Sequence, residues 1–264
     1  MSRARGGAIA GLAVVGGVAL VVFIVLPVLA LIVRAPWSSA AEILGQPANR
    51  VALRLSLQVS LWALVLSGVF GFPIAWLLAR VPFPGRRIMR ALVLLPMVLP
   101  PVVGGVALLV AFGRRGLIGQ WLDQWFGIQL AYTTTAAVLA ATFVSMPFFI
   151  VTVESALRST DRRYEDAART LGASPVTVLR RVTLPSIRGA LVAGGALAWA
   201  RALGEFGATI TFAGSFAGRT QTMPLAINRA LDSDVRTAIL LSLVLLAISV
   251  GVLASLRDRW LGSP

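Results

Sequence analysis

Long apolar stretches separated by short polar segments run along nearly the whole chain. A helix that crosses the ~30 Å hydrocarbon core of a bilayer needs about 20 predominantly apolar residues. Six stretches reach that length, at residues 8–33, 51–79, 91–112, 131–153, 189–213 and 237–256. The pattern therefore predicts an all-α integral membrane protein with six transmembrane helices.

The first stretch has a second interpretation, because Arg3 and Arg5 in front of it also fit a secretory signal. The apolar region of a signal runs for only about 7–15 residues, and this stretch is roughly twice as long. We therefore expect a retained helix. The chain then divides into an N-terminal helix with its outer loop (1–50), a core domain (51–257) and a short cytoplasmic tail (258–264).

The distribution of arginine predicts the direction of the spans. Positive residues gather in the cytoplasmic segments of membrane proteins. With the N-terminus inside, fifteen arginines fall in inside segments and eight in outside segments. Both termini are therefore expected in the cytoplasm. The longest polar stretch, residues 154–188, becomes a cytoplasmic loop.

Composition narrows the range of functions. Hydrophobic residues make up 58% of the 264 residues, and all 24 basic residues are arginine, with no Lys, His or Cys. A phosphate-binding P-loop needs Lys, and thiolate metal sites need Cys. We therefore expect no catalytic site, metal or cofactor in this chain. Most arginines flank apolar spans, so the net charge of +14 indicates membrane topology rather than a nucleic-acid partner.

Proline and glycine interrupt the third span. The stretch LPMVLPPVVGG, residues 95–105, contains Pro100 and Pro101 followed by Gly104 and Gly105. In a membrane, neighbouring helices can satisfy the backbone groups that proline frees. The stretch is either a kinked, closely packed helix or a bend that lines a pathway. No internal repeat is evident, which disfavours a secondary transporter built from inverted halves.

The loop at 154–188 predicts two short helices joined by a sharp turn. Thr160 or Asp161 can cap the first helix, and Gly172 suits the left-handed residue at its end. Ser174 can cap the second helix, which Pro185 ends. Each helix has an apolar face, so the loop either lies on lipid headgroups or docks on another protein. Those faces consist of Tyr164, Ala167, Ala168 and Leu171 on the first helix, and Val176, Leu179 and Val182 on the second.

The same loop carries a spaced motif. Permeases of ABC importers have E-A-A, three residues, G, nine residues, then I-x-L-P. This chain has Asp166-Ala167-Ala168, Gly172 and Val182-Thr183-Leu184-Pro185 at that spacing, with Asp for Glu and Val for Ile. The chain resembles that family, which implies a type I ABC importer permease fold with a cytoplasmic coupling helix that docks in a groove of the ATPase subunit. The implied coupling residues are Glu165, Asp166, Ala167, Ala168, Gly172, Ala173, Val182, Leu184 and Pro185.

Two charged residues lie inside the fifth span. Arg201 and Glu205 are four apart and would share one face of a helix. Charge inside a membrane is costly, so the two are either a mutually satisfied structural pair or part of a pathway. An oxyanion pathway would favour the arginine. The candidate pathway residues are Arg201, Glu205, Thr209, Ser145, Pro100 and Pro101.

The substrate is suggested by resemblance alone. Residues 200–212 (ARALGEFGATITF) and 218–227 (GRTQTMPLAI) look like permeases of molybdate importers, as do 98–105 and 113–128. The ARALGEFGA part also resembles sulfate permeases. Import of molybdate, with tungstate sharing the route, is therefore implied, and sulfate or thiosulfate is the alternative.

The resemblance also implies an assembly in the bacterial inner (plasma) membrane. It contains a second copy of this chain and two ATPase subunits that bind ATP and Mg²⁺. An extracytoplasmic molybdate-binding protein docks near residues 218–227, on the outer side. The alternative from another class of protein is an ion-coupled secondary anion transporter. Such a transporter would not need the coupling loop.

Overall fold

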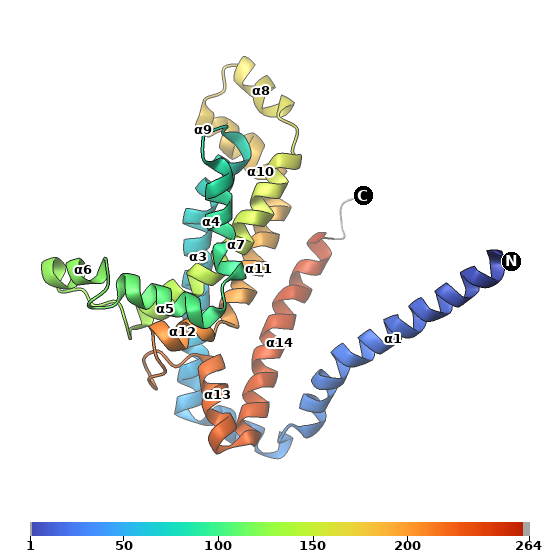
Figure 1. Cartoon of the computed structure of the whole chain (residues 1–264), viewed down its shortest axis with the longest axis vertical. Helices are drawn as coiled ribbons and strands as arrows, with labels where there is room; N and C mark the ends of the chain where they lie inside the picture. The colour runs from blue at the N-terminus through green and yellow to red at the C-terminus, as the bar shows by residue number, and fades with distance from the viewer. Residues whose placement is uncertain (1, 261–264) are drawn as a thin grey trace.

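The computed structural model describes residues 2–260, and every regular element in that range is a helix (Figure 1). Helix α14 continues to Trp260, into the expected tail at 258–264, and residues 261–264 lie outside the described range. Four helices are long and apolar enough to cross a membrane: α1 (Ser2–Arg34), α3 (Pro47–Arg80), α7 (Thr134–Ser159) and α14 (Val235–Trp260).

The third predicted span is broken into two helices. Helices α4 (Arg86–Val98) and α5 (Pro101–Phe112) meet at an angle of 116°. Leu99 and Pro100 between them are extended, with ψ of 135° and 133°. Each of the two precedes a proline, which disfavours the helical conformation. The third span is therefore bent at Pro100–Pro101, within the stretch 95–105 where the sequence predicted a kink or a bend.

The fifth predicted span is broken as well. Just before the predicted bounds of 189–213, a helical segment meets α11 (Arg188–Leu203) at 72°; this segment consists of α9 (Pro175–Val178), the π turn η2 (Leu179–Thr183) and α10 (Leu184–Ser186). Helix α11 ends before a separate short helix, α12 (Gly207–Phe212), so the continuous helix predicted over 189–213 is wrong. Counting each bent pair as one span gives six spans, the predicted number.

The centre of the bundle is formed by α3, α7 and α11, which pack through small side chains. Small residues let membrane helices approach closely. A Cβ on Gly71 of α3, for instance, would lie 3.0 Å from the Phe149 ring of α7. The buried alanines at this centre are Ala63, Ala75, Ala136, Ala137, Ala140, Ala141, Ala198 and Ala202.

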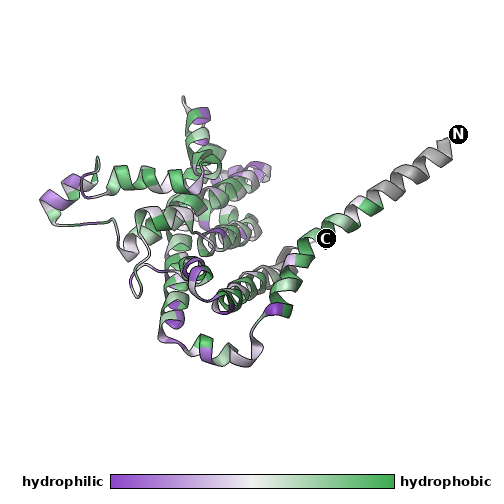
Figure 2. Cartoon of the chain, turned by 60° about the horizontal axis from the view of Figure 1, so that its bottom comes forward, coloured by the Kyte–Doolittle hydropathy of each residue, from purple (hydrophilic) through white to green (hydrophobic). Residues whose placement is uncertain are grey.

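Short helices close the two ends of the bundle (Figure 1). One end carries α8 (Arg163–Thr170), α9 and α10, and the opposite end carries η1 (Trp37–Ser39), α2 (Ala40–Gly45) and α13 (Met223–Ser233). Helices α5, α6 (Gly119–Phe126) and α12 lie crosswise between them. The predicted cytoplasmic loop and the predicted outer segment 218–227 therefore lie at opposite ends. Figure 2 shows that hydrophobic residues cover the long helices.

Helix α1 stands apart from the bundle (Figure 1). None of its span, Val14–Arg34, is buried, and it contacts α14. Side chains that are exposed along a whole apolar span must face lipid or another chain. Helix α1 is therefore peripheral to the sites described below.

Candidate functional site

The predicted cytoplasmic loop has a first short helix, α8, then a turn and a second helical run made of α9, η2 and α10. That run continues through Pro185 to Ser186, so the helix end predicted at Pro185 is wrong. Neither expected residue occupies the N-cap of α8, which is Arg162; Asp161, one residue earlier, accepts the Arg163 N–H at 2.9 Å through its Oδ1. Thr160 instead ends α7, where its hydroxyl donates to the Ala156 carbonyl. Gly172 has φ of +84°, the left-handed conformation that ends α8. Ser174 Oγ accepts the Thr177 N–H at 3.3 Å, which caps α9 as predicted.

The tip of the loop exposes apolar side chains. Leu171 is 88% exposed, Tyr164 is 70% exposed and Val176 is 60% exposed. The apolar faces predicted for the two helices therefore remain uncovered at their outer positions within the part of the chain that the structure describes. Apolar groups gathered at a basic tip indicate a surface that meets a partner.

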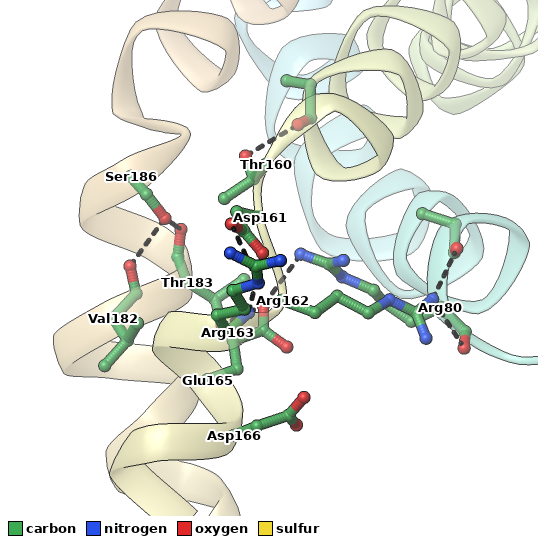
Figure 3. Close-up of polar contacts among 12 residues, drawn as sticks. Arg80, Thr160, Asp161, Arg162, Arg163, Glu165, Asp166, Val182, Thr183 and Ser186 are labelled. Carbon is green, nitrogen blue, oxygen red and sulfur yellow. Dashed lines mark hydrogen bonds and ion pairs between the residues drawn. The ribbon is translucent and has the colours of Figure 1, made fainter.

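The inner side of the loop is held by charge. Glu165 Oε1 accepts a hydrogen bond from Arg80 Nη2 of α3 at 2.9 Å and one from the Thr183 hydroxyl of η2 at 3.1 Å. The Arg80 and Glu165 side chains are both only 6% exposed. Figure 3 shows Arg80 reaching from α3 to the loop, while Arg162 reaches the other way. Arg162 donates to the carbonyls of Ala79 and Arg80, each at 3.2 Å.

The other motif residues lie around this anchor. Asp166, the aspartate at the motif position, is exposed and pairs with Arg169 at 3.0 Å, whereas Glu165 is buried and faces inward. Sequence reasoning treated both acids as one acidic feature, and the structure separates their roles. The remaining coupling residues are half-buried (Ala168, Ala173, Val182 and Leu184) or exposed (Ala167, Gly172 and Pro185).

A second ion-pair cluster lies at the same end of the bundle. Glu154 of α7 pairs with Arg90 of α4 and, at 3.1 Å, with Arg158 one turn further along α7. The Glu154 side chain is 8% exposed. This cluster joins α4 to α7 and does not involve the loop helices.

The breaks in the third and fifth spans fit into each other. A Cβ on Gly105 of α5 would lie 2.7 Å from Thr211 Cβ and 2.8 Å from the Ala208 carbonyl oxygen of α12. A Cβ on Gly207 would lie 2.6 Å from Pro101 Cβ. Real Cβ atoms do not approach so closely, so only glycine allows the two short helices to touch. The bend at Pro100–Pro101 brings α5 across the bundle to make this contact.

Arg201 and Glu205 form an ion pair, with 2.7 Å between Nη1 and Oε2. Glu205 is not on a helix as predicted, because it lies in the break between α11 and α12. Its other oxygen, Oε1, accepts the Ala208 N–H at 2.8 Å and thereby stabilises the start of α12. The Glu205 side chain is 2% exposed and the Arg201 side chain 28% exposed, so the arginine is the accessible member of the pair.

A small polar pocket surrounds Glu205. It is lined by Ser56, Thr209 and Thr222 together with apolar groups, and it leaves no space for a water molecule. Ser56 Oγ accepts the Met223 N–H at 2.6 Å, and the Thr222 hydroxyl is buried without a hydrogen-bond partner among the described residues. Thr222 is the N-cap residue of α13, but its side chain does not cap that helix. The pocket is closed in this conformation.

The structure brings together only part of the predicted pathway set. Arg201, Glu205 and Thr209 meet, and Pro101 lies beside them against Gly207. Pro100 is exposed at the bend. Ser145 lies apart, buried between α7 and α3, with its hydroxyl 3.5 Å from that of Ser67. Sequence reasoning missed Ser56 and Gly207, because their roles depend on contacts with distant segments.

A polar cavity of about 440 Å³ opens at the end of the molecule opposite the loop. Arg229 of α13 is exposed and has no ion-pair partner within residues 2–260. Asp234 is engaged, since its carboxylate accepts from the Thr237 hydroxyl at 2.6 Å; that hydrogen bond lowers the pKa of Asp234. The polar lining consists of Gln46, Asn49, Gln221, Arg229, Ser233, Asp234 and Thr237.

Comparison with known proteins agrees with this geometry. The chain is 45% identical over 239 residues to the molybdenum transport system permease protein ModB of Mycobacterium tuberculosis, covering 90% of each chain. It is 37% identical over 238 residues to the sulfate transport system permease protein CysT of Salmonella typhimurium, covering 89% of this chain and 86% of that one. A bacterial alginate ABC transporter, solved with its alginate pentasaccharide-bound periplasmic protein, shares the fold with a TM-score of 0.74 at 15% identity, covering 94% of this chain and 93% of that one.

A family model described as a binding-protein-dependent transport system inner membrane component matches residues 71–263. The match contains the cytoplasmic loop, both broken spans and the Arg201–Glu205 pair. The fold is that of a type I ABC importer permease, as the loop motif implied, and the protein is a multi-pass inner-membrane permease subunit. The chain belongs to the family of binding-protein-dependent transport system inner membrane components.

Proposed function

We propose that this chain forms the translocation pathway of an ATP-driven importer for molybdate, with tungstate sharing the route. The observation that carries the proposal is 45% identity, over 90% of both chains, to a molybdenum transport permease. The sulfate permease relative is less similar, at 37% identity. Sulfate is therefore the second candidate, because it is also a tetrahedral oxyanion.

Coupling to a separate ATPase is supported by the loop. Its uncovered tip, with Leu171, Tyr164 and Val176, offers an apolar surface for a groove on that subunit. Two copies of this chain would pair with two ATPase chains, which bind ATP and Mg²⁺, since this chain has no P-loop lysine. Both termini then lie in the cytoplasm, on the side of the loop.

The interlocked α5–α12 contact is a good candidate for the closed barrier of the pathway. It lies across the bundle, and the pocket beside it has no space for water. Arg201 would be the group that meets a passing oxyanion, because it is the exposed member of its pair. Opening would require α5 and α12 to separate, which glycine packing permits without breaking hydrogen bonds between them.

Delivery of the substrate is assigned to an external binding protein that docks over the outer cavity. Arg229 in this cavity lacks an acidic partner within the described part of the chain, so a carboxylate of the binding protein would form an ion pair with it. Arg229→Glu should weaken docking at least tenfold in a binding assay on the assembled complex. Arg115→Glu is the control, because Arg115 is exposed near α6 and does not line the cavity. Equal loss in both variants would point to overall charge instead.

The experiment that tests the function is uptake into vesicles that contain this chain, its ATPase and the binding protein. We expect molybdate uptake that requires ATP. Uptake driven by an ion gradient without ATP would instead support a secondary transporter. Calorimetry of the binding protein with molybdate, tungstate and sulfate decides the substrate: tight sulfate binding and no molybdate binding would favour the sulfate alternative.

A further inference from the structure

The cytoplasmic loop is joined by the chain to α7 and α11 but is clasped to α3 by side chains. Arg80, the last residue of α3, pairs with Glu165 at 2.9 Å. Arg162 donates to two carbonyls at the same end of α3. These contacts cross more than eighty residues of sequence. A loop that only had to present a docking surface would not need them.

Glu165 is the centre of this clasp. One of its oxygens accepts from both Arg80 of α3 and Thr183 of η2, so a single carboxylate ties three segments together. The pair is 6% exposed on both sides, and a buried charge that loses its partner is strongly unfavourable. The end of α3 must therefore follow α8 when the loop moves.

The far part of α3 reaches the pocket beside the barrier. Helix α3 has 34 residues, about 51 Å at 1.5 Å per residue. Ser56, near its other end, lines the pocket with Glu205 and accepts the first N–H of α13. One continuous helix thus joins the loop to the pocket and to the outer helix α13.

We propose that Glu165 and Arg80 are positioning residues that transmit displacement of the coupling loop to α3, and through α3 to the pocket at Ser56 and Glu205. The proposal rests on the proposed function, since it assumes that an ATPase moves the loop. Asp166, Leu171 and the rest of the tip contact the partner, while Glu165 faces inward and links that contact to the membrane helices. Docking and transmission are thus assigned to neighbouring residues of the same short helix.

The test measures ATP hydrolysis and molybdate uptake in the same vesicles, with the complete complex. Glu165→Gln keeps an acceptor for Thr183 but removes the charge that holds Arg80. We expect ATP hydrolysis to stay within twofold of wild type while uptake per ATP falls about tenfold. The exchanged pair, Arg80→Glu with Glu165→Arg, should recover at least a third of the wild-type uptake per ATP. A proportional fall of both rates, or an unchanged ratio, would overturn the proposal.

Arg158→Gln is the matched control. It removes an arginine at the same end of the bundle whose ion pair, with Glu154, lies within α7. Its uptake per ATP should equal that of wild type. An equal loss of coupling in this control would show that any charge at this end has the same effect, and would reject a specific role for Glu165.

A second variant, with two cysteines, tests the proposal even if the charge variants fold poorly. The chain has no cysteine, so Arg80→Cys with Glu165→Cys introduces the only two thiols of each copy of this chain. Short bifunctional thiol reagents should restore uptake per ATP severalfold over the unlinked form, because a covalent link replaces the ion pair. Linked complex that couples no better than unlinked complex would reject the proposal. Absence of ATP-driven molybdate uptake in wild type would instead reject the proposed function, which separates the two failures.

Discussion

Charged side chains hold the cytoplasmic loop against α3, whereas glycines hold α5 against α12. In the loop, Glu165 and Arg80 form a buried pair, and the apolar tip is left uncovered. In the α5–α12 contact, Gly105 and Gly207 leave no space for a Cβ. The contacts of the first region are directional ion pairs, and its apolar tip is exposed. The contacts of the second region are close packing between the two helices.

The difference fits the roles proposed above for the two regions. A charged clasp keeps its geometry while the loop is pushed, because directional bonds resist rotation as well as separation. Glycine contacts hold closely when closed but leave few polar groups unpaired when they part. A moving connector and an opening barrier therefore call for different side chains, and each variant below tests one side of that contrast.

The largest effect is expected at the α5–α12 contact. Gly105→Ala would place Cβ 2.7 Å from Thr211 and 2.8 Å from the Ala208 carbonyl. Overpacking of this kind costs about 1–3 kcal/mol. We expect a lower thermal midpoint and at least a tenfold loss of uptake. Gly68→Ala in α3 is the control, since nothing lies within 4 Å of its Cβ; equal loss there would contradict a steric role for Gly105.

The next effect concerns the turn at Gly172. Its φ is +84° and its Cβ position is open within this chain, so the requirement there is conformational. Gly172→Val forces a β-branched residue into a left-handed conformation, at about 1–3 kcal/mol, and should reduce ATP-coupled uptake about tenfold. Gly172→Asn, which tolerates that conformation, should keep at least half of the uptake. If asparagine is as harmful as valine, close approach of the ATPase, rather than backbone conformation, is the cause.

A smaller effect is expected at Glu205. Glu205→Gln removes the Arg201 ion pair but keeps an acceptor for the Ala208 N–H. Because the amide still fills the site and only the partly exposed Arg201 loses its partner, the thermal midpoint and the uptake rate should both fall by less than in Gly105→Ala. The preference for molybdate over sulfate, measured by competition, should not change. A large shift in that preference would mean that this pair selects the substrate. Glu42→Gln, at an exposed outer position, should match wild type.

The smallest effect is expected at the cap of α9. Ser174→Ala removes the acceptor for the Thr177 N–H, a loss of about 1 kcal/mol. Hydrogen exchange at residues 175–178 should become faster, with uptake within twofold of wild type. Ser174→Thr keeps the cap and should show wild-type exchange. Uptake that collapses in the alanine variant would make the cap part of the docking surface itself.

Local signals in the sequence predicted the loop well. Gly172 and Ser174 act through a dihedral angle and a hydrogen bond within a few residues, so their roles can be inferred from sequence. The number of spans also follows from hydropathy, once each bent pair is counted as one.

Contacts between distant segments were not predictable in the same way. The break at Glu205 lies in an apolar stretch, and its position depends on α5 packing against α12. The anchoring role of Glu165 depends on Arg80, which is 85 residues away in the chain. Ser56 became relevant only through Met223, across 167 residues. No periodic or local pattern contains that information.

The π turn η2 gives the fixed spacing of the loop motif a geometric meaning. A π turn holds one residue more than an α turn, and each residue of a helix rotates the next side chain by about 100°. The nine residues between Gly172 and Val182 run into this turn. Deleting one of them while η2 keeps its π turn would rotate Thr183 by about 100° away from Glu165, whereas closing η2 as an α turn would absorb the deletion. The length of the motif and the π turn together therefore set the angle at which Thr183 meets Glu165.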